Sequence, residues 1–202
     1  MLRRQLVTGL RMTIAMIVLV GLAYPLLVTG VAQGLMSHRA DGSFVKVDGK
    51  VVGSSLIGQN FTDAKGNPLP QYFQPRPSAA GTDGYDAMAS GGSNLGPSSQ
   101  TLLTDVAQRI AAYRKLNGVP ANVEVPVDAV TASASGLDPG ISVANARLQA
   151  ARVAAARGVS VAEVMKLIDQ HTESRSLGVL GEKAVNVLEL NLALDKATKA
   201  TS

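Results

Sequence analysis

An uncharged apolar run over residues 12–32, preceded by Arg3, Arg4 and Arg11, constrains this chain more than any other feature of its sequence. The hydrocarbon core of a bilayer is about 30 Å thick, and roughly 20 apolar residues of helix cross it. Because no water reaches that core to satisfy backbone groups, a helix is the expected form of the run. The first constraint on the fold is therefore one membrane-spanning helix.

The position of the three arginines predicts the orientation of that helix. Basic residues close to a span stay preferentially on the cytoplasmic side of the membrane. We therefore expect residues 1–11 in the cytoplasm, the transmembrane helix over 12–33 and an extracytoplasmic domain over 34–202. This single-pass topology excludes most cytosolic functions.

A cleaved export signal is the alternative interpretation of the run. Gly30, Val31 and Ala32 offer small residues at the spacing that a signal peptidase reads, but export signals have apolar cores of about 7–15 residues, and this core is longer. Pro25 is acceptable in a retained span if a neighbouring helix satisfies the carbonyl that it leaves free. The retained anchor is the preferred interpretation.

Composition limits the possible fold and chemistry of the chain beyond the span. The length after residue 33 suits one domain with its own core. The chain has no cysteine, which excludes disulfides, thiolate nucleophiles and cysteine metal sites. Its net charge of +4 owes much to the N-terminal arginines, and aromatic residues make up only 3% of the chain, so we expect no nucleic-acid binding.

The first elements of this domain are predicted by local signals. Asp48-Gly49 lies between β-forming residues and predicts a hairpin over 43–57. A helix is expected from Ser99 to Leu116, because Leu103, Val106, Ile110 and Tyr113 form one apolar stripe. The valine-rich stretch 123–131 predicts a short edge strand, limited by a proline.

The later elements alternate between helix and strand. Ser142 is expected to cap a helix to Arg157 that packs through Ala144, Leu148, Ala151 and Ala155. Ser160 and Glu163 form a capping box at the start of a third helix, which ends near His171. The segment 185–194 is ambiguous, with a short strand over 185–187 followed by a helix as the preferred solution. The expected fold class is α+β, with one N-terminal transmembrane helix and a single extracytoplasmic domain.

Residues 60–97 predict a long loop. They hold many prolines and glycines, together with four of the six aromatic residues beyond the span. Loops of this length are usually functional or disordered, and the aromatic content argues against disorder. We expect an ordered loop packed on something, with a partner protein as one candidate.

A glycine-rich segment at the end of this loop is the candidate ligand site. It comprises Ser90, Gly91, Gly92, Ser93, Asn94 and Gly96. Unhindered backbone N–H groups ahead of a helix could approach a phosphate, although the Gly-Lys-Ser/Thr end of a P-loop is missing. A structural turn or a partner-contact loop is the main alternative. No catalytic constellation and no metal site are expected, since His38 and His171 lack companion ligands.

Several stretches in this order resemble the C subunit of the Kdp potassium-transporting P-type ATPase. The resemblance covers nearly the whole chain, and its stretches are Gly53-Ser-Ser-Leu-Ile-Gly-Gln59, Tyr72-Phe-Gln-Pro-Arg-Pro-Ser-Ala79, Ser90-Gly-Gly-Ser-Asn-Leu-Gly-Pro97, Val125-Pro-Val-Asp-Ala-Val-Thr131, Ser135-Gly-Leu-Asp-Pro139 and Val185-Asn-Val-Leu-Glu-Leu-Asn-Leu-Ala-Leu-Asp195. One departure is Gly140, where the family often has a histidine, so no role of that histidine is carried over to this chain.

The resemblance implies a non-catalytic accessory subunit in the bacterial inner membrane. Its expected partners are a channel-like K⁺-binding subunit, a P-type ATPase subunit and a small single-span subunit. The family is described as aiding assembly and as a catalytic chaperone that raises the affinity of the ATPase subunit for ATP, so ATP is expected to act through the complex. The span, with Tyr24 and Pro25, would pack on the channel-like subunit, and the loop region would cap that subunit's outer face. An independent, membrane-anchored envelope binding protein or enzyme is the alternative.

Overall fold

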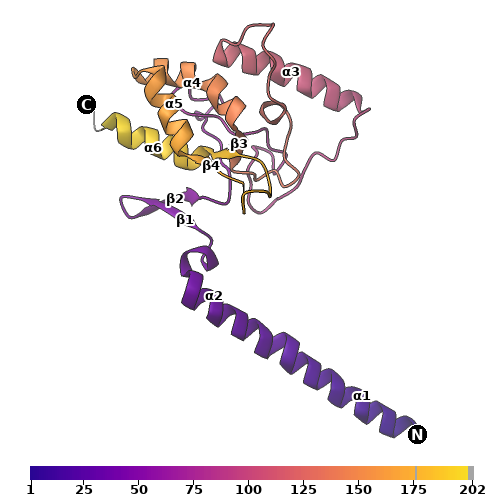
Figure 1. Ribbon diagram of the computed structural model, residues 1–202. Coiled ribbons are helices and arrows are strands. Elements are labelled where there is room, and N and C mark those ends of the chain that lie inside the picture. Colours follow the sequence, from indigo (N-terminus) through magenta and orange to yellow (C-terminus); the bar gives the residue numbers. More distant parts are fainter. Residues whose placement is uncertain (176, 200–202) are drawn as a thin grey trace. The chain divides into compact units, whose positions relative to one another are not determined.

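The structure is a computed structural model that describes residues 1–175 and 177–199. Contacts divide the chain into a first unit, Met1–Val51, and a second unit that begins at Val52 (Figure 1). In chain order the elements are α1 (Leu2–Met16), a π-helical segment (Ile17–Ala23), α2 (Tyr24–Ala40), β1 (Phe44–Val47), β2 (Lys50–Ser54), α3 (Gln100–Asn117), a 3-10 helix (Val127–Ala129), β3 (Gly140–Ser142), α4 (Val143–Arg157), α5 (Val161–Gln170), β4 (Thr172–Glu173), β5 (Ala184–Asn186) and α6 (Val187–Lys199).

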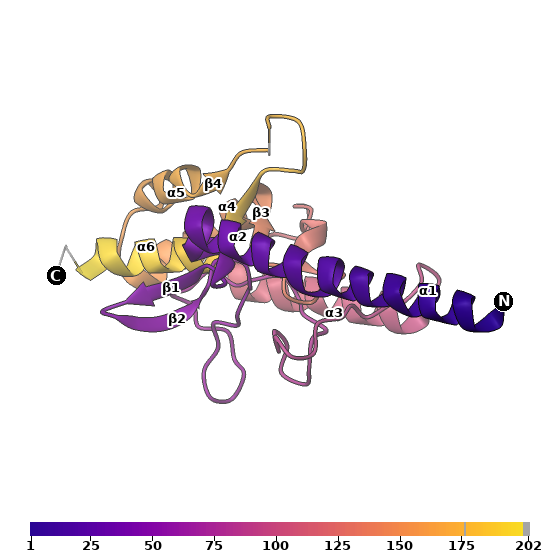
Figure 2. The same ribbon diagram turned by 90° about the horizontal axis from the view of Figure 1, so that it is seen from below.

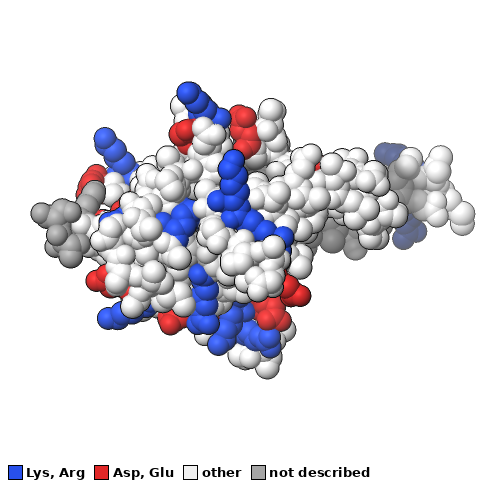
Figure 3. Space-filling view, turned by 90° about the horizontal axis from the view of Figure 1, so that it is seen from above, with Lys and Arg blue, Asp and Glu red and all other residues white. Residues whose placement is uncertain are grey.

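The first unit is dominated by one continuous helix, Leu2–Ala40, that includes the π-helical segment. It is long and apolar enough to cross a membrane, with a mean hydropathy of 2.3 over an 18-residue window and no part of that window buried. In Figure 3 this helix carries basic residues near its N-terminal end and is otherwise almost free of charge. The predicted span lies inside this helix, which is longer than the span.

The helix is irregular at two places. The π-helical segment ends at Ala23, two residues before Pro25, where the chain lacks an N–H. Near its end, Met36 leaves the helical conformation (φ −144°, ψ 41°), and Gln33 Nε2 donates a hydrogen bond to Asp41 Oδ1 (2.9 Å) across this kink. The kink comes after the predicted end of the span at residue 33.

The predicted hairpin is confirmed. β1 pairs with β2, and the turn uses positive φ at both Asp48 (50°) and Gly49 (78°), as a type I′ turn requires. Strand β2 carries the chain into the second unit.

The second unit is α+β, as predicted. A three-stranded antiparallel sheet has the order β3-β5-β4, with Ile141 opposite Val185 and Thr172 also opposite Val185. Helix α4 contacts α3 and α5, and α5 contacts α6 (Figures 1 and 2). The core lies between these helices and the sheet and includes Phe73, Ile141, Val153, Val164, Ile168, Val185, Leu190 and Leu194, all of which are 1% exposed or less.

Helix boundaries agree with the expected caps. Ser99 Oγ accepts a hydrogen bond from Leu102 N, and Ser142 Oγ accepts one from Asn145 N. Ser160 and Glu163 form the reciprocal capping box at α5. The ambiguous segment resolves into β5 and then α6, close to the preferred solution.

The long loop is held by polar side chains in the core. Residues 60–97 contain no helix and no strand beyond an isolated bridge pair, as predicted. Asn191 Oδ1 accepts from Phe73 N (2.8 Å) and Asn191 Nδ2 donates to Phe73 O (3.0 Å), while Gln149 bonds both backbone groups of Gln74 in the same way (2.8 and 3.1 Å). Because buried backbone groups must be paired, these two amides allow the loop to lie in the core without a strand partner.

The aromatic residues of this loop are used inside the domain. Phe73 is fully buried, the Phe61 and Tyr72 rings lie 5.3 Å apart, and the Arg157 guanidinium lies 4.8 Å from the centre of the Tyr72 ring. The loop therefore packs on its own domain.

Two predictions for the second unit are wrong. The expected strand at 123–131 does not form, and Val127–Ala129 within it is a 3-10 helix. There Asp128 accepts hydrogen bonds from Ser142 N, Ser142 Oγ (both 2.8 Å) and Asn145 Nδ2 (2.9 Å) at the start of α4. An extended edge would carry that carboxylate away from the helix.

The second error concerns the packing face of α4. Ala144, Ala151 and Ala155 are exposed, and Leu148 is only half-buried. The buried face instead comprises Asn145, Ala146, Gln149, Ala150, Val153 and Ala154. Alanine carries little hydrophobic signal, and the polar members of this face are buried because they form hydrogen bonds inside the domain.

Candidate partner-contact site

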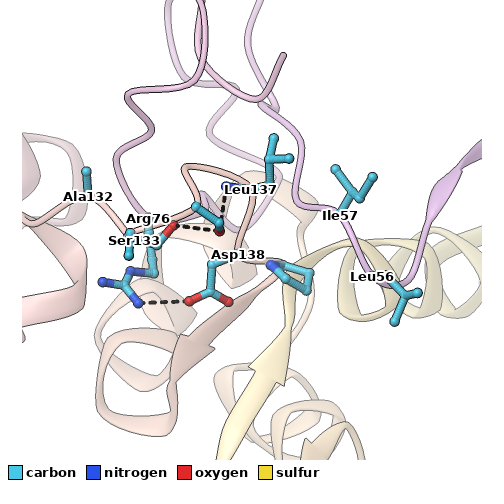
Figure 4. A pocket seen from close by; sticks show the side chains of 10 residues that line it. Leu56, Ile57, Arg76, Ala132, Ser133, Leu137 and Asp138 are labelled. Carbon is cyan, nitrogen blue, oxygen red and sulfur yellow. Dashed lines mark hydrogen bonds and ion pairs between the residues drawn. The ribbon is translucent and has the colours of Figure 1, made fainter. Parts of the chain in front are cut away.

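An open hollow of about 620 Å³ on the second unit brings together stretches that are far apart in the sequence (Figure 4). Its walls come from Leu56 and Ile57, from Arg76 and from residues 132–139. Three of the stretches that resemble the Kdp C subunit contribute to it. The hollow is therefore the candidate functional site of this domain.

A tight turn over residues 133–136 builds one wall of the hollow. Gly136 has φ 67°, and a Cβ there would lie 2.6 Å from Gly91 O and 2.8 Å from Ala80 Cβ. Only glycine fits this position, because both the backbone conformation and the space exclude a side chain. Ser135 Oγ accepts a hydrogen bond from Leu137 N (3.1 Å) and fixes the exit of the turn.

An ion pair forms the charged part of the hollow. Arg76 Nη1 lies 2.8 Å from Asp138 Oδ2, and Asp138 Oδ1 accepts from Gly140 N (2.9 Å). The two side chains are 23% and 35% exposed. Arg76 Nε is buried and has no hydrogen-bond partner among the residues that the structure describes. A buried donor without a partner is unusual in a folded domain.

Tyr85 supports this ion pair through the backbone. Its hydroxyl donates to Arg76 O (2.9 Å), and its ring leaves no room for a side chain at Gly58, where a Cβ would lie 2.4 Å from Tyr85 Cε1. Burial, and then the negative charge of Asp138, raise the pKa of the Tyr85 hydroxyl well above its ordinary value. The hydroxyl therefore stays a neutral donor across the physiological range.

Apart from Ser133 and Ser135, the rest of the lining is apolar. Leu56 stands at its edge with 61% of its surface exposed, and Ile57, Ala132 and Leu137 continue the wall (Figure 4). Aliphatic side chains around a partly desolvated ion pair match the make-up of protein–protein contacts, where apolar groups surround a few polar anchors. The arrangement suits recognition of another protein surface.

The predicted glycine-rich segment adjoins this site. Ser135 O accepts hydrogen bonds from Gly91 N (2.8 Å) and Ser90 Oγ (3.0 Å), and a Cβ at Gly92 would lie 3.0 Å from Ala134 O. Gly92 therefore packs closely against the turn, whereas Gly91 contributes its backbone N–H and has room for a side chain. Asn94 has positive φ (52°), Ser93 and Asn94 are exposed, and Gly96 O accepts from Ser99 N just before α3. Nucleotide binding by this segment stays a prediction.

The other predicted residues belong to the first unit. Arg3, Arg4 and Arg11 are exposed on α1, and Tyr24 and Pro25 are exposed at the start of α2. The hollow itself was missed by sequence reasoning. Arg76 and Asp138 both stand in stretches that resemble the family, but their pairing across 62 residues leaves no local signal.

Comparisons with known proteins identify the family. The family model described as the K⁺-transporting ATPase, c chain, KdpC, matches residues 6–196. The potassium-transporting ATPase KdpC subunit of Mycobacterium tuberculosis (strain H37Rv) is 57% identical over 195 residues, which cover 96% of this chain and 100% of the relative. The KdpC subunits of Gemmatimonas aurantiaca and Koribacter versatilis are 55% and 49% identical, over 96% of this chain and 93% and 95% of their own lengths. The chain therefore belongs to the KdpC family, the c chains of K⁺-transporting ATPases.

Proposed function

We propose that this chain is a non-catalytic accessory subunit of an ATP-driven K⁺ uptake complex, in which it aids assembly and raises the affinity of the ATPase subunit for ATP. The near full-length match to KdpC subunits carries this proposal. Its partners would be the channel-like K⁺-binding subunit, the P-type ATPase subunit and a small single-span subunit.

The proposed location is the inner membrane, with the N-terminus in the cytoplasm and the second unit outside. The single long apolar helix supports anchoring, and Arg3, Arg4 and Arg11 support the orientation. ATP is on the opposite side of the membrane from a domain so placed. An effect on ATP affinity would then pass through the span and the partner helices, with Tyr24 and Pro25 among the contacts.

In this proposal the hollow around Arg76 and Asp138, with the adjoining Ser90–Gly96 segment, contacts a partner subunit. The segment's packing role supports partner contact over direct nucleotide binding, since the Gly91 N–H is already bonded to Ser135 O. The exposed apolar edge at Leu56 supports the same interpretation.

A pull-down tests the proposal. Tagged full-length chain is purified from detergent-solubilised membranes of K⁺-starved cells. Recovery of the ATPase and K⁺-binding subunits, K⁺-stimulated ATP hydrolysis, and a higher KM for ATP when the chain is removed are the expected results. Recovery of the folded chain alone would favour the independent envelope protein.

A pair of leucine variants tests the role of the hollow. Leu56→Asp should reduce recovery of the complex, because it places a charge at the apolar edge. Leu103→Asp is the matched control, since Leu103 is 53% exposed on α3 and does not line the hollow. Equal recovery of the complex with both variants would show that the hollow is not part of the interface.

A further inference from the structure

The carbonyl of Val20, in the middle of the apolar helix, has no backbone donor within the described helix. In an α-helix its donor would be the N–H of residue 24, and in a π-helix that of residue 25. The Tyr24 N–H donates to Leu19 O instead, at the end of the π-helical segment. Pro25 has no N–H at all. The π-helical segment and the proline together leave this acceptor unpaired within the helix.

Val20, which carries this carbonyl, is also one of the residues that line a groove on the helix surface. The groove has a volume of about 580 Å³ and is lined by Met12, Thr13, Met16, Ile17, Val20 and Gly21. At Gly21 an added Cβ would meet only Ile17 Cγ2, at 3.9 Å, so nothing in the described chain covers the backbone there. Another helix can approach the main chain closely at this glycine.

Whether the carbonyl of Val20 needs a protein donor depends on whether water can reach it. On a surface exposed to hydrocarbon no water can satisfy a carbonyl, and prolines in spans are tolerated where a neighbouring helix or a local adjustment supplies the missing bond. The local adjustment is present here as the π-helical segment, yet it leaves Val20 unpaired. The flexible side chains of Met12 and Met16 allow the groove to fit a partner of irregular shape.

We propose that this groove seats a transmembrane helix of another subunit of the K⁺-transporting ATPase, and that a hydroxyl or amide side chain of that helix donates a hydrogen bond to Val20 O. The proposal rests on the proposed function as an accessory subunit. Beyond that function, the proposal specifies which face of the span contacts a partner, where along the span the contact lies and which chemical group the partner contributes.

Site-specific photo-crosslinking tests the face. A photoreactive amino acid replaces Met16, which lines the groove, or Val18, which does not, in the full chain expressed with its complex. Illumination of membranes should give adducts from position 16, identified by mass spectrometry as a multi-span subunit of the complex, and far fewer from position 18. Equal adducts from both positions, adducts to lipid alone or adducts to a second copy of this chain would overturn the proposal.

Two enlargements on the same helix test the close approach. Gly21→Leu adds a side chain to the groove, where its Cβ would meet only Ile17 Cγ2, at 3.9 Å. It should lower recovery of the complex about tenfold, the effect of losing one close helix contact in lipid. Ala15→Leu enlarges a residue outside the groove and should leave recovery unchanged. Equal recovery with both would overturn the inference alone, whereas a wild-type chain that recovers no partner would overturn the proposed function.

Discussion

The two units differ in which side chains they expose and which they bury. The helix Leu2–Ala40 buries none of its residues and exposes a long apolar surface. The second unit buries Asn145, Gln149 and Asn191 to 1% exposure or less. Apolar side chains face outward in the first case, and polar side chains face inward in the second. The apolar side chains of the helix can therefore be covered only by other molecules, whereas the domain supplies hydrogen-bond partners for its own buried polar side chains.

This contrast has a consequence for mutational sensitivity. A residue of the domain is held by several segments at once, so its removal should be felt in unfolding experiments. No residue of the helix is buried by the described chain, so its removal should be felt mainly when partners or lipid are present. Urea unfolding of the full-length protein in detergent, followed by circular dichroism, measures this difference.

The largest effect is expected for Phe73→Ala. Phe73 is fully buried in the core, and removing such a side chain costs about 3–5 kcal/mol of the free energy of unfolding, since a cavity remains. Phe44→Ala is the control, because Phe44 is 51% exposed on β1. Similar losses in both variants would contradict the placement of the loop in the core.

Asn191→Ala should rank second. It leaves the N–H and the carbonyl of Phe73 buried without partners, at a cost of about 1–3 kcal/mol for each unsatisfied group. Asn122→Ala, at an exposed position, should change the free energy of unfolding by less than about 0.5 kcal/mol. An Asn191→Ala domain as stable as its control would show that the loop does not depend on this amide.

The acid dependence of the α5 cap should give a smaller effect. Hydrogen bonds from Ser160 N and then Ser160 Oγ lower the pKa of Glu163 below its ordinary value. The stabilisation is therefore complete above the ordinary glutamate pKa of about 4.3 and is lost as the pH falls through the lower, folded-state pKa. The stability difference between the wild type and Glu163→Gln should shrink towards low pH.

Glu124→Gln controls for the change in net charge, because Glu124 is exposed and outside the cap. Unfolding free energies of the three proteins are compared between neutral and strongly acidic pH. A difference between the wild type and Glu163→Gln that does not vary with pH would refute the capping role of the ionised carboxylate.

The smallest effect is expected in the helix. Leu26 is 70% exposed, so Leu26→Ala should leave the unfolding of the domain unchanged within about 0.5 kcal/mol. A loss of more than about 1 kcal/mol would contradict the exposed position of Leu26. Together with Phe73→Ala, this variant measures how sharply the two regions differ.

Features that depend on neighbouring residues could be predicted from the sequence. Asp48-Gly49 is a hairpin turn, and Ser160 with Glu163 is a capping box, because their partners lie within three residues. The buried face of α4 could not be predicted, since the buried amide of Gln149 bonds to Gln74, which lies 75 residues away. The hollow was missed for the same reason, as Arg76 meets Asp138 only in the folded domain.

The false strand at 123–131 shows the limit of propensity. Its valines favour an extended chain, but the hydrogen bonds of Asp128 to Ser142 outweigh that preference. The family resemblance was more informative about the hollow than propensity, because Arg76 and Asp138 both lie in stretches that match the family. It did not reveal that these stretches meet.

The hydrogen bonds between Phe73 and Asn191 join residues 118 positions apart. Ribosomes add about 5–20 residues each second, so roughly 6–24 s pass between the synthesis of the loop and that of its anchor. Contacts of such long range also slow the folding search itself. The loop, with its aromatic side chains, therefore waits uncovered until α6 has emerged, and this interval is when the nascent chain is most exposed to aggregation and proteolysis.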